Sequence, residues 1–214
     1  MKITILVADD HGIVRDGLRA LLESQSDMQI VALAENGRDA VRLAQQTIPH
    51  VAVLDIAMPE LNGIEAALQI HRICSQTQII ILSIYASSEH IYRALHAGAT
   101  GYLIKESAGA ELISAVRAVA AGQRYLSQKI SDTVLGDFLA HHQQRSPLES
   151  LSEREREVLQ LTVEGKTAAQ IAAILSLSAK TVETYRSRLM QKLAVADLPA
   201  LVRFAIQHGL MSLE

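Results

Sequence analysis

Short apolar runs alternate with amphipathic segments along the first part of the chain. The runs predict buried strands at 3–8, 29–34, 50–54, 78–83 and 101–105. The segments that follow them keep their apolar residues on one helical face and predict helices at 13–23, 37–46, 63–72, 88–96 and 109–121. Regular alternation of strand and helix predicts an α/β domain with a five-stranded, doubly wound parallel sheet, ending near residue 122.

A different pattern begins after residue 147. Ser152 and Glu155 have the spacing of a capping box, which predicts a helix start. Thr167, Ser178 and Asp197 precede three further segments of helical period. Short helices separated by a tight turn predict a small all-α helix-turn-helix domain at 148–214. The polar stretch at 123–147 is expected to be a linker, partly helical over 132–142.

Composition supports two folded domains in this chain of 214 residues. Its 49% hydrophobic and 20% charged residues suit globular cores. No apolar run reaches the roughly 18 residues of a membrane span, and no signal peptide is apparent. We therefore expect a cytoplasmic protein with no membrane partner. The single cysteine, Cys74, is expected to be a buried thiol.

Carboxylates follow two of the predicted strands. Asp9 and Asp10 come after the first strand and Asp55 after the third. Because ligands of open parallel sheets bind at the carboxyl ends of the strands, these three acids are expected to converge. An acid after a strand is also a common helix cap, so Asp55 alone indicates little. Converging carboxylates repel one another unless a cation compensates them, and oxygen ligands favour Mg²⁺.

Two more polar residues end predicted strands of the same sheet. Ser83 and Lys105 would bring a hydroxyl and an ammonium to the edge that carries Asp55. Those groups can bind the oxygens of a phosphorylated Asp55. Taken singly, Ser83 could be a helix cap and Lys105 a surface charge. Together with the acids they favour phosphoryl chemistry at Asp55.

These residues resemble the receiver domain of two-component response regulators over about residues 1–122. The matching positions are Asp9-Asp10, Asp55 with Met58-Pro59 and Asn62-Gly63, Ser83, and Gly101-Tyr102-Leu103-Ile104-Lys105. The resemblance implies a flavodoxin-like fold in which a sensor histidine kinase phosphorylates Asp55. It also implies a Mg²⁺ site made by Asp9, Asp10, Asp55 and the backbone carbonyl of Ala57, with Lys105 pairing with the phosphoryl oxygens.

By the same resemblance, Ser83 and Tyr102 would form a switch pair. The charge and oxygens added at Asp55 would draw the Ser83 hydroxyl inward, and Tyr102 would fill the vacated space. Tyr102 as an ordinary strand aromatic is the alternative. Ala57 carries no polar group that could orient an attacking water, so we expect slow loss of the phosphoryl group.

The segment from 178 to 193 predicts a basic helix. It contains four basic residues and one acidic residue, Glu183. This excess of positive charge is also typical of an ordinary solvent-exposed helix face. The motifs Leu151-Ser152-x-Arg154-Glu155-x-Glu157-Val158-Leu159, Ile171-Ala172 and Lys180-Thr181-Val182-Glu183-Thr184 resemble the LuxR-type DNA-binding domain over about 148–210. The resemblance implies that this helix reads the major groove of DNA.

The same resemblance distributes the DNA contacts. Glu183, Thr184 and Ser187 would face base edges, and phosphates would be held by Lys180, Thr181, Arg186, Arg188 and Lys192. Glu183 is difficult, because phosphates repel a carboxylate unless it accepts from cytosine N4. Simple exposure of Glu183 is the alternative. Ala194 stands where many relatives have Gly at the helix end.

Together the two resemblances identify the chain as similar to the NarL/FixJ group of response regulators. The expected function is a phosphorylation-controlled, non-enzymatic transcription regulator. Its expected partners are a sensor histidine kinase, paired half-sites on double-stranded DNA and a second copy of the chain when phosphorylated, with RNA polymerase as a further candidate. Two alternatives are a phosphorylation-independent regulator with a dimerising receiver and a Mg²⁺-dependent phosphohydrolase. Ala57 argues against the hydrolase, which often carries an acid there.

Overall fold

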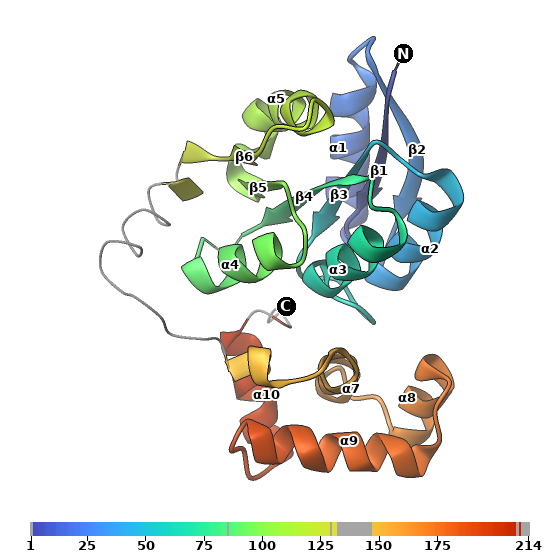
Figure 1. The fold of residues 1–214 in the computed structure, drawn as a ribbon, viewed down its shortest axis with the longest axis vertical. Coiled ribbons are helices and arrows are strands. Elements are labelled where there is room, and N and C mark those ends of the chain that lie inside the picture. Colours follow the sequence, from blue (N-terminus) through green and yellow to red (C-terminus); the bar gives the residue numbers. More distant parts are fainter. Residues whose placement is uncertain (1, 85, 129, 132–146, 209, 211–214) are drawn as a thin grey trace. The chain divides into compact units, whose positions relative to one another are not determined.

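The computed structural model describes residues 2–84, 86–128, 130–131, 147–208 and 210, which are drawn in colour in Figure 1. The chain divides into two compact units, residues 1–142 and 143–214. The helix predicted over 132–142 lies outside the described residues. None of the described helices is long and apolar enough to cross a lipid bilayer.

The first unit contains one parallel sheet. Its strands are β1 (Ile3–Ala8), β2 (Met28–Ala34), β3 (Val51–Asp55), β4 (Gln78–Ser83), β5 (Gly101–Ile104) and β6 (Tyr125–Leu126), in the order β2-β1-β3-β4-β5-β6. The predicted doubly wound parallel sheet is confirmed, but its strand number is corrected from five to six. The sixth strand pairs with β5 and extends the sheet beyond residue 122. Its two residues are too few to produce a recognisable apolar run.

Two layers of helices cover the sheet, as Figure 1 shows. One layer is α1 (Gly12–Glu23) and α5 (Ala108–Ala120), and the other is α2 (Gly37–Thr47), α3 (Gly63–Ile73) and α4 (Ser88–His96). Along β1, Ile5 and Val7 share a core with α1 and α5, whereas Leu6 and Ala8 share one with the other layer. Successive side chains of a strand point to opposite faces, so burial of both faces explains the continuous apolar runs.

Local capping sets the starts of α2 and α3 near the end of β3. The side chain of Asn36 accepts a hydrogen bond from the Asp39 N–H, and that of Asn62 accepts from the N–H groups of Ile64 and Glu65. A Cβ at Gly37 would lie 1.9 Å from the carbonyl oxygen of Leu61. The first turn of α2 therefore packs directly against the loop that follows Asp55.

The second unit is all helical over its described residues, as predicted. It contains a short 3₁₀ segment, η2 (Pro147–Ser150), and the helices α7 (Glu153–Val163), α8 (Ala168–Leu175), α9 (Ala179–Lys192) and α10 (Leu198–Gln207). Ser152, Thr167, Ser178 and Asp197 each cap the helix that follows them. Leu159, Ile171, Val182, Leu189 and Leu201 belong to one core. Because α9 packs against both α7 and α8, one face of α9 is buried and the other remains exposed.

Candidate functional site

Three carboxylates meet at the carboxyl edge of the sheet. Asp9 directly follows β1 and Asp55 ends β3, and these strands are neighbours with Ala8 opposite Leu54. Ligand atoms of Asp9, Asp10, Asp55 and His11 all lie within 4.8 Å of one another. Asp9 and Asp55 are buried, while Asp10 is exposed. The sheet reverses its strand order beside β1, which is where this fold class places its ligand site.

Lys105 supplies the positive charge of this cluster. Its Nζ lies 2.8 Å from Asp9 Oδ2 and 2.8 Å from Asp55 Oδ2. The strand predicted to end at Lys105 ends at Ile104, and Lys105 begins a short 3₁₀ turn, η1 (Lys105–Ser107). Burial alone would lower the pKa of Lys105, but the charges and hydrogen bonds of Asp55 and Asp9 outweigh it and raise the pKa. The ammonium therefore stays charged at neutral pH.

One ammonium compensates only part of the negative charge of the two buried carboxylates, Asp9 and Asp55. Burial raises the pKa of Asp55, and the attraction of Lys105 offsets this only in part. Within the described residues, the Lys105 ammonium is the one group within 4.0 Å that pairs with Oδ2 of Asp9 and with Oδ2 of Asp55. A hard divalent cation fits this set of oxygen donors. Ala57, expected to contribute a carbonyl, is half-buried in the bend directly after β3.

Sequence reasoning missed two residues beside the acids. His11 Nδ1 lies 2.7 Å from Asp10 Oδ1, and the His11 N–H donates to Asp9 Oδ1 at 2.9 Å. The charge of Asp10 is the largest influence on His11 and raises its pKa. Arg15 donates from Nη1 to the Asp9 carbonyl oxygen at 2.8 Å and pairs with Glu35. The run Asp-Asp-His, with an arginine four residues later on the predicted helix, is the pattern that could have indicated both.

Ser83 and Tyr102 are brought together behind this edge. Ser83 ends β4, Tyr102 lies in the adjacent strand β5, and both side chains are buried. Burial raises the pKa of Tyr102 to about 12, although a hydrogen bond with the Ser83 side chain acts in the opposite direction. The charge of Asp55 also raises the Tyr102 pKa. The Tyr102 hydroxyl is therefore hydrogen-bonded to Ser83, and its pKa responds to the charge of Asp55.

The exposed face of α9 carries the residues expected to contact DNA. Val182 and Leu189 are buried, whereas Lys180, Glu183, Thr184, Ser187 and Arg188 are exposed and Thr181 and Arg186 are half-buried. Arg186 Nη1 donates to Glu183 Oε1 at 3.2 Å. The Glu183 carboxylate thus contacts a neighbouring cation of the same helix, which reduces the difficulty of placing an acid near phosphates.

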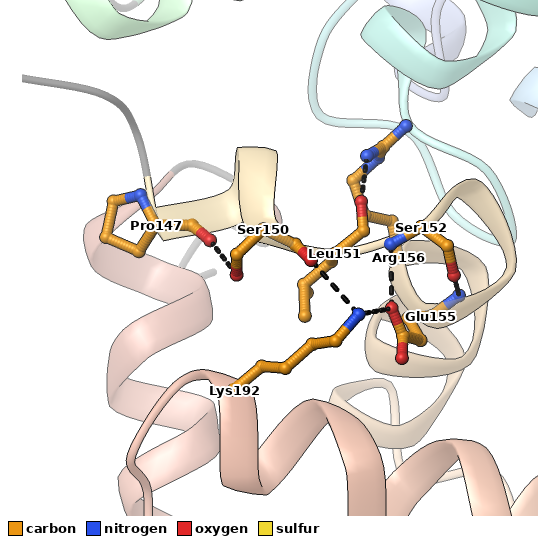
Figure 2. Close-up of polar contacts among 7 residues, drawn as sticks. All are labelled: Pro147, Ser150, Leu151, Ser152, Glu155, Arg156 and Lys192. Carbon is orange, nitrogen blue, oxygen red and sulfur yellow. Dashed lines mark hydrogen bonds and ion pairs between the residues drawn. The ribbon is translucent and has the colours of Figure 1, made fainter.

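Lys192 differs from the other cations of α9. Its Nζ donates to Glu155 Oε2 at 2.7 Å and to the Ser150 carbonyl oxygen at 3.1 Å, as Figure 2 shows. The ammonium is therefore directed to the start of α7. That Lys192 holds a DNA phosphate stays a prediction.

Comparison with known proteins agrees with both halves of the structure. Residues 5–117 match the response regulator receiver domain, and residues 149–205 match the bacterial regulatory proteins of the LuxR family. The transcriptional regulatory protein LiaR of Bacillus subtilis is 37% identical over 98% of this chain and 100% of its own length. The response regulator UvrY of Escherichia coli K12 is 35% identical over 99% of this chain and 97% of its own.

A solved structure is similar to this chain over nearly its full length. The response regulator RcsB in complex with DNA has a TM-score of 0.59 and 26% identity, covering 95% of this chain and 98% of that chain. The fold and the acidic edge thus define a receiver protein with a helix-turn-helix domain. The chain belongs to the two-component response regulators of the NarL/FixJ group, with a receiver and a LuxR-type DNA-binding domain. It is a transcription regulator.

Proposed function

We propose that phosphorylation of Asp55 by a sensor histidine kinase switches this regulator, and that α9 then binds DNA as part of a homodimer. The carrying observation is the Lys105 ammonium, which lies 2.8 Å from both buried carboxylates, Asp9 and Asp55. A surface lysine would not contact two buried acids of other strands. The arrangement provides a nucleophile, a fixed cation and a set of oxygen donors at one edge.

In the phosphoryl transfer, an Asp55 oxygen attacks phosphorus, the bond between phosphorus and the kinase histidine breaks, and the imidazole takes up a proton. Lys105 is placed to bind a phosphoryl oxygen as charge develops there. Mg²⁺, held by Asp9, Asp10, Asp55 and the carbonyl of Ala57, would neutralise the remaining charge. The buried position of Asp55 limits access of water to the product.

The proposed switch uses the contact between Ser83 and Tyr102. A phosphoryl group on Asp55 adds acceptor oxygens that compete for the Ser83 hydroxyl. Tyr102 would then lose a hydrogen-bond partner in a buried site and move with it. Because Tyr102 belongs to β5, the change would reach the surface formed by α4, β5 and α5.

For DNA recognition, Lys180, Thr181, Arg186 and Arg188 are proposed to hold phosphates, and Glu183, Thr184 and Ser187 to face base edges. All lie along the exposed or half-buried part of α9. The solved complex of RcsB with DNA supports DNA binding by this architecture. One small domain makes few phosphate contacts, so pairing two domains on two half-sites should raise affinity. Since the proposed partner is DNA, the proposed location is the cytoplasm.

The test is selection of bound duplexes from a random-sequence pool at fixed salt, with and without a small-molecule phosphoryl donor and Mg²⁺. Wild type is compared with Asp55→Ala and with the control Asp16→Ala, an exposed acid on α1. We expect the donor to increase binding for wild type and Asp16→Ala but not for Asp55→Ala. Equal binding in every condition would favour a phosphorylation-independent regulator. Steady release of phosphate from phosphate esters would instead favour a hydrolase.

A further inference from the structure

Lys192 connects three segments of the second unit. It is the last residue of α9, its Nζ donates to Glu155 Oε2 in the first turn of α7, and it also donates to the Ser150 carbonyl oxygen at the end of η2. Figure 2 shows the Lys192 side chain directed towards Ser150 and Glu155, which with Ser152 and Leu151 form the polar cluster at the start of α7. The contacts join positions 37 and 42 residues apart in sequence. They attach the C-terminal end of α9 to the end of η2 and to the first turn of α7.

Glu155 is a buried carboxylate held at several points. Its Oε2 also accepts from the Ser152 N–H at 2.7 Å, and its own N–H donates to Ser152 Oγ at 3.3 Å, which completes a capping box. Burial would raise the pKa of Glu155, but the hydrogen bonds from Lys192 and Ser152 together lower it. Lys192 is the cation that compensates this buried charge, while its own side chain is 42% exposed.

The segment before α7 is tied into the same cluster. Ser150 Oγ donates to the Pro147 carbonyl oxygen at 2.7 Å, and Arg156 Nη1 donates to the Leu151 carbonyl oxygen at 2.6 Å. Leu148 and Leu151 are buried in the core of the unit. A shift of α9 along its axis would therefore break the pair with Glu155 and the bond to Ser150 together.

We infer that Lys192 is a positioning residue, which fixes the end of α9 against α7 and thereby sets how α9 enters the DNA groove. It is not a phosphate contact. The inference rests on the proposed function, because it presupposes that α9 binds DNA. Two of the three N–H donors of Lys192 already bind Glu155 and the Ser150 carbonyl oxygen, and drawing the ammonium towards a phosphate would leave the buried charge of Glu155 less compensated.

The salt dependence of DNA binding separates the two roles of a lysine. Each phosphate neutralised by a cation contributes about 0.9 to the slope of log affinity against log salt. Lys180, an exposed residue in the first turn of α9, is the matched comparison. We expect Lys180→Met to reduce the slope by about 0.9. We expect Lys192→Met to weaken binding several-fold with the slope unchanged.

Glu155→Gln gives the sharper contrast, because the two roles predict opposite results. Glutamine preserves the capping hydrogen bond but removes the charge that holds Lys192. If Lys192 positions α9, Glu155→Gln weakens binding several-fold, and the double variant with Lys192→Met loses little more than either single variant. If Lys192 contacts phosphate, Glu155→Gln frees it, and binding is unchanged or tighter.

The experiment uses the full chain treated with phosphoryl donor and Mg²⁺, the duplex selected from the random pool, and a temperature at which circular dichroism shows every variant to be folded. A titration with duplex at a concentration far above Kd measures the fraction of each preparation that can bind DNA. Equal fractions show that a lower affinity does not reflect unfolded protein. Reduced slope for Lys192→Met, or undiminished affinity for Glu155→Gln, would overturn the inference. Failure of wild type to bind any duplex would instead overturn the proposed function.

Discussion

Gly63 begins α3 directly against Asp55, so closely that a Cβ at Gly63 would lie 1.9 Å from the Asp55 carbonyl oxygen. The Gly63 N–H also donates to the Ile56 carbonyl oxygen at 2.9 Å, which closes the loop after β3. No side chain fits between these two segments. The position of the proposed phosphoacceptor therefore depends on a glycine eight residues further along the chain.

Gly63→Ala is expected to lower the free energy of unfolding by about 1–3 kcal/mol, the usual cost of overpacking, and to slow phosphorylation of Asp55. The matched control is Gly17→Ala within α1, where a Cβ would meet no atom of the described residues within 4 Å. Alanine is the better helix former, so the control should gain about 0.5–1 kcal/mol. Urea denaturation measures both. Equal changes of the same sign would show that the approach to Asp55 is unimportant.

Glu155 predicts a pH dependence of stability. Because its folded pKa is lower than its usual value of 4.5, the ionised form stabilises the fold above that value. This contribution is lost as the pH falls through the folded pKa. Glu155→Gln should therefore cost about 1–2 kcal/mol at pH 7, and the difference from wild type should shrink as the pH falls below about 4.5.

The control for this prediction is Glu183→Gln, which removes an exposed ion pair with Arg186. Exposed pairs contribute little, so its effect should stay within about 0.5 kcal/mol at either pH. Denaturation curves at several pH values give the comparison. A Glu155→Gln deficit that persists unchanged in acid would mean that the charge of Glu155 is not what stabilises the folded protein.

Ala194 follows α9 in a left-handed conformation, with φ of 53°. Its N–H donates to the Gln191 carbonyl and the Val195 N–H to the Met190 carbonyl, the two bonds of a Schellman ending. Alanine is strained there, so Ala194→Gly should raise the free energy of unfolding by about 1 kcal/mol. Gly165 has a φ of 79°, and a Cβ there would meet no atom of the described residues within 4 Å, so it provides the reverse test. Gly165→Ala should cost a similar amount, and thermal unfolding would report opposite shifts.

Ala57 places a methyl group two residues after Asp55, where no polar group can orient an attacking water. Ala57→Asn is expected to speed loss of the phosphoryl group about tenfold, which is less than the rate increase that general acid–base catalysis typically gives. Decay of the labelled acyl phosphate, followed in purified protein, measures the rate. Ala57→Val is the control, since it changes size without adding a polar group. Similar decay in all three proteins would contradict the prediction.

The sequence by itself determined the longer helices and strands of this protein and the edge of the sheet that carries its acids. Buried strands need apolar residues on both faces, and helices need one apolar stripe. The local pattern of apolar residues therefore predicted β1, β3 and α9. Asp9 directly follows β1 and Asp55 is the last residue of β3, and the carboxyl ends of these strands share one edge of the sheet. Parallel topology then places both acids at that edge, and the pairing of β1 with β3 brings them together.

Only the tertiary structure decided which groups the long charged side chains contact and whether the shortest strand forms. The two residues of β6 left no periodic pattern, and the carboxylates that Lys105 contacts lie at the carboxyl ends of β1 and β3. A row of cations on α9 indicated a basic helix without showing that Lys192 turns to Glu155. The reason is physical: periodicity records which face is buried, whereas the partner of a flexible charged side chain depends on how segments distant in sequence pack together.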